Sequence, residues 1–120
     1  MSQHITDSNF SITSIGSILL VHLNEAIDDD SIKRLLDALA QAIVQTASTG
    51  IIIDLSNMEV IDSYLASRLS TIASVASLLR AKAIISGLKT PTIITLLKFG
   101  IKISGVEFAL DVDHALEKLM

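Results

Sequence analysis

Three consecutive isoleucines, Ile51, Ile52 and Ile53, restrict the fold of this chain more than any other feature. β-branched side chains favour strands, and an apolar run without alternation is typical of a strand that is buried on both faces. Such strands belong to parallel sheets whose faces are covered by helices. The run therefore predicts a central strand of an α/β domain, and the strand is expected to stop at Asp54.

Helical periodicity is present on both sides of this strand. The acidic residues 28–30 suit the start of a first helix, which we expect to end near Gly50. Apolar residues recurring every three or four positions predict a second helix over residues 63–80. The two apolar stripes are Ile32, Leu35, Leu36, Leu39 and Ile43, and then Leu65, Leu69, Ile72, Ala76 and Leu79.

The other elements complete an alternating order of strands and helices. Loose alternation on either side of Gly16 predicts an N-terminal β-hairpin over residues 10–23. The remaining expected elements are a strand at 83–85, a helix at 92–99 introduced by Thr90 and Pro91, a strand at 106–110, and a closing helix capped by Asp111 or Asp113. We therefore expect a mostly parallel mixed sheet packed with helices.

Length and composition indicate one globular domain. The chain has 120 residues, of which 50% are hydrophobic and 18% charged, so it can bury a substantial core. We expect residues 1–9 to form a flexible N-terminal segment and residues 10–120 to form the domain. Because the chain has no cysteine and residues 1–11 show neither a basic leader nor an apolar core, we expect a cytoplasmic protein.

Several classes of function are disfavoured. A net charge of −4 and only four aromatic residues, three Phe and one Tyr, argue against nucleic-acid binding. The longest apolar runs are too short to cross a membrane. The three histidines show no metal-ligand spacing, the five glycines form no phosphate loop, and Ser63 lacks the context of a catalytic nucleophile. We expect no metal, no cofactor and no enzymatic activity.

The loop over residues 54–64 is the local arrangement best suited to a function, because it places a hydroxyl group at a helix N-terminus. In one interpretation Asp62 or Ser63 is only a helix N-cap. In the other, Ser63 accepts a phosphate, which the helix dipole would favour although Asp62 and Glu59 lie close by. Such a phosphate would change binding rather than the fold.

Serine residues form a stripe along the second expected helix, roughly opposite its apolar stripe. Exposed helix faces are normally rich in charged residues, whereas small hydroxyl side chains let another surface approach closely without loss of charge hydration. Both a docking surface and a solvated face fit this pattern. The stripe consists of Ser63, Ser67, Ser70, Ser74 and Ser77.

Residues 10–119 resemble the STAS domain of bacterial anti-sigma factor antagonists. Residues 51–55 followed by Val60–Ser63 are similar to that family's strand and phosphorylation loop, in which the serine after the aspartate is the phosphoacceptor. The resemblance therefore implies a STAS fold and phosphorylation of Ser63. Residues 85–88, together with Pro91 and the apolar residues up to Ile101, resemble the corresponding strand and helix of the stressosome branch.

Two features indicate the RsbS type within this family. Anti-anti-sigma factors usually follow the Asp-Ser pair with a small residue and a glycine, whereas this chain has Tyr64 and Leu65, a bulky pair as in RsbS-like proteins. RsbR-like paralogues carry an additional N-terminal sensor domain and generally have threonines at their phosphosites. Here only a few residues precede the first expected strand.

The resemblance implies a stress-signalling scaffold that assembles with RsbR-like paralogues into a stressosome and sequesters an RsbT-like serine kinase. Phosphorylation of Ser63 would release the kinase, and the partner-binding residues would be Asp62, Ser63, Tyr64, Ser67 and Ser70. Two alternatives stay open: an anti-anti-sigma factor that binds an anti-sigma kinase directly, and a small ligand-binding module or enzyme. A second phosphosite at Ser56 is also left open.

Overall fold

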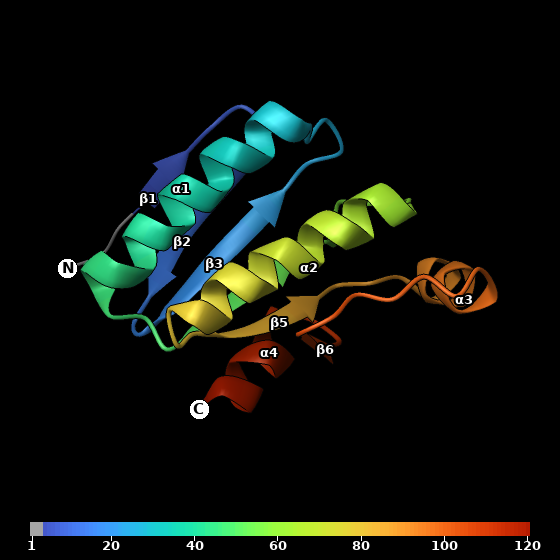
Figure 1. Ribbon diagram of the computed structural model, residues 1–120. Coiled ribbons are helices and arrows are strands. Elements are labelled where there is room, and N and C mark those ends of the chain that lie inside the picture. Colours follow the sequence, from blue (N-terminus) through green and yellow to red (C-terminus); the bar gives the residue numbers. More distant parts are fainter. Residues whose placement is uncertain (1–3) are drawn as a thin grey trace.

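A single six-stranded sheet forms the centre of the protein, in a computed structural model that describes residues 4–120 (Figure 1). The strands lie in chain order. Pairing is antiparallel from β1 to β3 and parallel from β3 to β6, which confirms the predicted mixed, mostly parallel sheet. The strands are β1 (His4–Thr6), β2 (Phe10–Ile15), β3 (Ile18–Leu23), β4 (Gly50–Asp54), β5 (Lys82–Ser86) and β6 (Glu107–Ala109).

Helices lie on both faces of the sheet. They are α1 (Asp29–Thr46), α2 (Ser63–Leu78), α3 (Thr90–Lys98) and α4 (Val112–Leu119). Figure 1 shows α1 and α2 across one face, α4 near the C-terminus on the other, and α3 beyond the carboxyl end of β5. Within residues 4–120, no helix has the length and hydropathy needed to cross a bilayer.

The predicted role of the isoleucine run is confirmed. All five residues of β4 are buried, and the strand pairs in parallel with β3 on one side and β5 on the other. Ile51 and Ile53 join the large core beneath α1 and α2, whereas Ile52 packs with Ile84 and Ala115 in a smaller core under α4. Consecutive strand residues point to opposite faces, so a run without alternation fits a strand with a core on each side.

Both α1 and α2 end earlier than predicted, and the bounds of β5, α3 and β6 differ from the prediction by one or two residues. The first helix ends at Thr46 rather than near Gly50, because Ala47 adopts the left-handed conformation with φ of 51°. Gly50 is instead the first residue of β4, where a Cβ would lie 2.9 Å from a methyl carbon of Leu119. The glycine therefore makes room for α4, and its role is in packing rather than in stopping a helix. The second helix ends at Leu78, two residues earlier than expected.

The strand β1 lies within the segment 1–9 that was expected to precede the folded domain. It pairs antiparallel with β2, with Ile5 opposite Ile12. No sequence pattern predicted this strand, because three residues with one apolar side chain are too short to show alternation. Residues 1–3 of the expected flexible segment lie outside the described residues.

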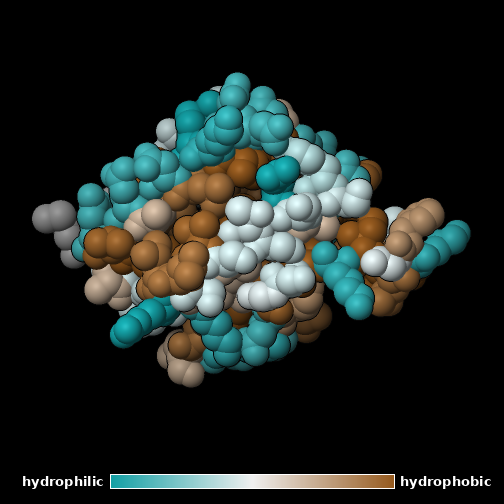
Figure 2. Space-filling model, in the orientation of Figure 1, coloured by the Kyte–Doolittle hydropathy of each residue, from teal (hydrophilic) through white to brown (hydrophobic). Residues whose placement is uncertain are grey.

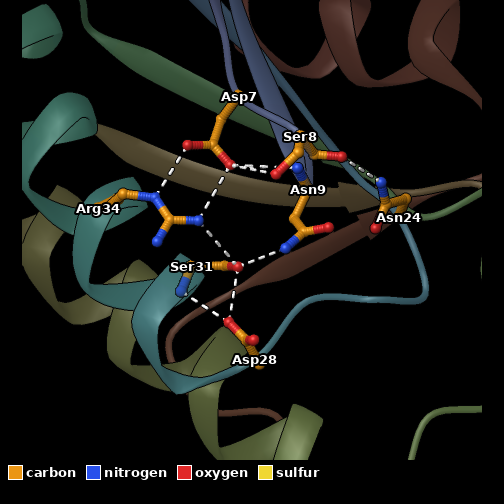
Figure 3. A network of polar contacts seen from close by, with 7 residues as sticks. All are labelled: Asp7, Ser8, Asn9, Asn24, Asp28, Ser31 and Arg34. Carbon is orange, nitrogen blue, oxygen red and sulfur yellow. Dashed lines mark hydrogen bonds and ion pairs between the residues drawn. The ribbon is translucent and has the colours of Figure 1, made fainter.

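A polar network joins the β1–β2 connection to the start of α1 (Figure 3). Arg34 donates two hydrogen bonds to the Asp7 carboxylate, from Nε at 2.9 Å and from Nη2 at 3.2 Å. The N-cap residue Asp28 accepts hydrogen bonds from the backbone and the hydroxyl of Ser31, which in turn accepts one from Asn9. The Arg34 hydrogen bond is the main cause of a lowered pKa of Asp7, and the Ser31 hydroxyl is the main cause for Asp28.

An Asp7→Asn variant is expected to be less stable than the wild type at pH 7, with a difference that shrinks in acid. The folded-state pKa of Asp7 lies below its ordinary value of 3.8, so the ionised carboxylate stabilises the fold above that pH. This contribution is lost as the pH falls through the lowered pKa. Urea unfolding of both proteins at pH 7 and pH 3 measures the effect. A stability difference that did not change with pH would contradict it.

Candidate functional site

The predicted phosphoacceptor, Ser63, lies at the first position of α2. Asp62 is the N-cap residue: its carboxylate accepts a hydrogen bond from the backbone N–H of Leu65 at 2.8 Å. Ser63 is exposed, and no hydrogen bond joins its hydroxyl to any residue in the described part of the chain. Of the two capping possibilities, the structure therefore selects Asp62, and the Ser63 hydroxyl is left accessible.

Two backbone donors are also available at this helix end. The N–H of Leu65 is bound to the Asp62 side chain, and the N–H of Ala66 donates to the Asp62 carbonyl at 3.0 Å. The N–H groups of Ser63 and Tyr64 have no partner among residues 4–120. Unpaired N–H groups at a helix N-terminus favour an anion through hydrogen bonding and the helix dipole.

The loop that leads to Ser63 is anchored by apolar side chains. Leu55, Met58 and Ile61 are buried, whereas Val60 is 75% exposed. The Thr92 hydroxyl on α3 donates a hydrogen bond to the carbonyl of Glu59 at 3.1 Å. The loop therefore presents its polar residues and Val60 outward from a fixed base.

Asp54 organises the start of this loop from the end of β4. Its buried carboxylate accepts the Ser56 backbone N–H at 3.1 Å and the Ser56 hydroxyl at 3.0 Å. The Nδ1 of His22 on β3 lies 3.0 Å from the same carboxylate, and the Ser86 hydroxyl on β5 lies 3.5 Å from it. At Gly87, with φ of +82°, a Cβ would lie 2.9 Å from the Asp54 carboxylate. Sequence reasoning missed this group, although the aspartate that ends a buried strand was a usable signal.

The Ser56 hydroxyl differs from that of Ser63 because it donates a hydrogen bond to Asp54. Although Ser56 is exposed, phosphorylation there would remove a hydrogen bond that orders the loop and would bring a phosphate close to the Asp54 carboxylate. Phosphorylation of Ser56 would therefore cost a hydrogen bond of the folded loop, whereas the Ser63 hydroxyl has no such bond within residues 4–120.

Tyr64 connects the first turn of α2 to the start of α1. Its hydroxyl donates a hydrogen bond to the Asp29 carboxylate, and this bond is the main cause of a raised Tyr64 pKa. The guanidinium carbon of Arg68 lies 5.2 Å from the centre of the Tyr64 ring, and the Arg68 Nε lies 3.9 Å from Asp29. A bulky residue after the predicted phosphoacceptor thus holds the two helix ends together, and a small residue and a glycine would not do so.

The serine stripe on α2 divides into exposed and engaged members. Ser67, Ser74 and Ser77 are exposed, as is Ser63. Ser70 is half-buried. Its hydroxyl donates a hydrogen bond to the Ala66 carbonyl at 3.0 Å and accepts one from the backbone N–H of Ser104 at 2.9 Å. In Figure 2 the exposed side of α2 appears as a pale surface of intermediate hydropathy beside hydrophilic α1.

Acidic groups surround the start of α2. Asp62 and Glu59 are exposed next to Ser63, and Glu25 reaches the loop by accepting the backbone N–H of Glu59 at 3.3 Å. A hollow of about 280 Å³ lies between Glu25, Tyr64 and Val60. In the described residues no three His, Cys, Asp or Glu side chains are grouped in a way that would hold a metal ion.

Comparison with known proteins identifies the family to which this fold belongs. The family model of the STAS domain matches residues 9–115. A serine-to-glutamate variant of RsbS from Moorella thermoacetica is 30% identical, with a TM-score of 0.74, covering 90% of this chain and 92% of that chain. A chain from a structure of the stressosome, described as a signal integration and transduction hub, is also 30% identical, with a TM-score of 0.76, covering 90% and 94%.

The fold extends to more distant structures. The unphosphorylated anti-sigma factor antagonist SpoIIAA is 15% identical, with a TM-score of 0.64, covering 98% of this chain and 95% of that chain. No curated protein sequence matches the chain. This chain belongs to the STAS domain family. Within that family it is similar to RsbS and to the stressosome chain, and these similarities support a role in signalling.

Proposed function

We propose that this protein is a non-catalytic scaffold that holds a serine kinase similar to RsbT and releases it when Ser63 is phosphorylated. The observation that carries the proposal is the accessible, unpaired Ser63 hydroxyl at the start of α2, whose capping role is taken by Asp62. The likeness to RsbS and to a stressosome chain supports an assembly that includes RsbR-like paralogues.

A phosphate on Ser63 changes charge rather than fold. It adds about −1.5 to −2 charges at neutral pH, and the unpaired N–H groups of Ser63 and Tyr64 favour it at the helix end. The exposed carboxylates of Asp62 and Glu59 add to the negative charge at the same place. The modified helix end stays folded but presents a concentrated negative charge. This charge lowers the affinity for a partner whose surface fits the unmodified hydroxyl.

The kinase-binding surface in this proposal runs along α2 from its first turn. Ser63, Tyr64 and Ser67 are exposed there and uncharged, and Asp62 adds one exposed carboxylate at the start of the helix. Ser70 contributes less than the prediction assumed, because its hydroxyl already holds the Ser104 backbone. The cores of protein interfaces are depleted of charged residues, which fits this face of α2.

The chain acts as substrate and scaffold, and the kinase supplies the catalytic groups. In the transfer, the Ser63 hydroxyl oxygen forms a bond to the γ-phosphorus of ATP, the bond between that phosphorus and the β–γ bridging oxygen breaks, and ADP leaves. The hydroxyl proton passes to the kinase. Because this step needs ATP, we place the assembly in the cytoplasm.

Phosphate transfer to Ser63 tests the proposal. The wild type is incubated with the co-purified kinase and ATP·Mg²⁺, intact mass is recorded, and kinase release is followed on a sizing column. We expect one added phosphate and release for the wild type, neither for Ser63→Ala, and both for the Ser77→Ala control, whose lost hydroxyl is exposed near the other end of α2. An unchanged phosphate count in Ser63→Ala would refute the site. Phosphorylation of a small, unassembled protein would favour a free anti-anti-sigma factor.

A further inference from the structure

An apolar groove whose lining does not include Ser63 lies between α3 and the β6–α4 region. It encloses about 590 Å³, a volume typical of small-ligand sites. Several of its apolar residues are exposed: Leu97 is 77% exposed, Leu110 80% and Phe108 46%. Hydrophobic side chains gather around α3 at the right of Figure 2. Ile93, Ile101 and Ile103 complete the main apolar lining.

The edge of the sheet beside this groove is closed to an added strand. The Lys118 ammonium group donates to the Phe108 carbonyl at 2.8 Å, and the backbone N–H of Leu110 donates to His114 Nδ1 at 3.0 Å. These side chains of α4 occupy backbone groups that an additional strand would need. An occupant of the groove therefore contacts side chains rather than the strand edge.

The charged side chain that lines the groove is basic. Glu107, Asp111 and Asp113 lie beside it in sequence but are not among its lining residues, and Glu107 is paired with Lys82 at 2.9 Å. Lys102 lines the groove and forms no ion pair within residues 4–120, and Lys98 lies at the end of α3. His114 also lines the groove. Because its Nδ1 accepts a hydrogen bond, the imidazole carries its proton on Nε2, which is a donor.

We propose that this groove binds one molecule of an anionic amphiphile of the fatty-acid class. The apolar lining contacts the hydrocarbon chain, and Lys102 and the His114 Nε2–H face its carboxylate. A concave groove of this volume suits a single free chain, whereas binding to a bilayer surface uses an exposed amphipathic face. The inference does not depend on phosphorylation of Ser63.

Oleate below its micellar concentration is the probe for this site. Displacement of anilinonaphthalene sulfonate fluorescence measures affinity, and native mass spectrometry counts bound oleate. We expect one oleate per chain, about tenfold weaker binding in Lys102→Glu, and unchanged binding in the charge-matched control Lys33→Glu on α1. Leu97→Gln is expected to weaken binding similarly, and Val44→Gln, also exposed and on α1, is its control. Oleyl alcohol should bind Lys102→Glu and the wild type equally.

Three results would overturn the proposal: no saturable oleate binding to the wild type, equal affinities of the groove variants and their controls, or sedimentation with phosphatidylglycerol vesicles in place of saturable binding of free oleate. The last result would identify a membrane surface instead. Leu97 and Lys102 are exposed, so their variants should fold, and urea unfolding checks this. Ser63→Ala should bind oleate like the wild type, which separates this test from that of the proposed function.

Discussion

A Ser63→Glu variant is expected to bind the cognate kinase about a hundredfold more weakly than the wild type. Glutamate places a fixed negative charge where Asp62 and Glu59 are already exposed. Enclosing like charges in an interface costs several kcal/mol, and about 3 kcal/mol corresponds to a hundredfold loss of affinity. Surface plasmon resonance with the immobilised kinase measures the change, and the loss is expected mainly as faster dissociation.

The matched control for this variant is Ser77→Glu, which adds the same charge near the other end of α2 at an exposed position. Ser63→Glu should unfold at an equal or higher urea concentration than the wild type, because an acidic residue in the first turn is favoured by the helix dipole by about 0.3–1 kcal/mol. A weakened affinity together with an intact fold would therefore be an interface effect. Equal affinities of Ser63→Glu and Ser77→Glu would argue against docking at the start of α2.

Gly87→Ala is expected to lower the free energy of unfolding by about 2–5 kcal/mol. With φ of +82°, Gly87 has a backbone conformation that costs an L-residue about 1–2 kcal/mol. The new Cβ would also lie 2.9 Å from both the Asp54 carboxylate and the Ser56 backbone nitrogen. Asp54 is only 8% exposed and is held by His22, so it cannot easily move away from the new Cβ. This overpacking adds about 1–3 kcal/mol to the loss of stability.

Gly16→Ala separates the two causes. Gly16 also has a positive φ, of 59°, but nothing lies within 4 Å of a Cβ at that position. Its variant should lose only the backbone contribution of about 1–2 kcal/mol. Equal losses of the two variants in urea unfolding would show that contact with Asp54 is unimportant. Because Asp54 orders the loop that leads to Ser63, Gly87→Ala should also slow phosphorylation of Ser63, and Gly16→Ala should not.

The elements that could be predicted are those whose signal is local. The run from Ile51 to Ile53 identified a strand buried on both faces, and apolar spacing identified α1 and α2. The strand β1 was not predicted, because its three residues are too few to show a strand pattern. It forms by pairing with β2. Gly50 was misread for a related reason: a glycine that ends a helix and one that makes room for Leu119 look the same in sequence.

The start of α2 shows the same division at the candidate site. The sequence alone placed the carboxylate of Asp62 and the hydroxyl of Ser63 at a helix N-terminus. Which of the two caps the helix was decided only when the Asp62 side chain met the N–H of Leu65. Likewise, the serine stripe was visible in sequence, but the engagement of Ser70 depends on the Ser104 backbone, which lies 34 residues away along the chain.

The sequence by itself determined the order of most elements, the position of the central strand and the resemblance that marks Ser63, because each depends on neighbouring residues or on a contiguous motif. Only the tertiary structure decided how Asp54 holds the loop, how Tyr64 reaches Asp29 and where an apolar groove opens beside α3. Such features require contacts between residues far apart in the chain, and the periodicity of a segment carries no information about which distant segment will pack against it.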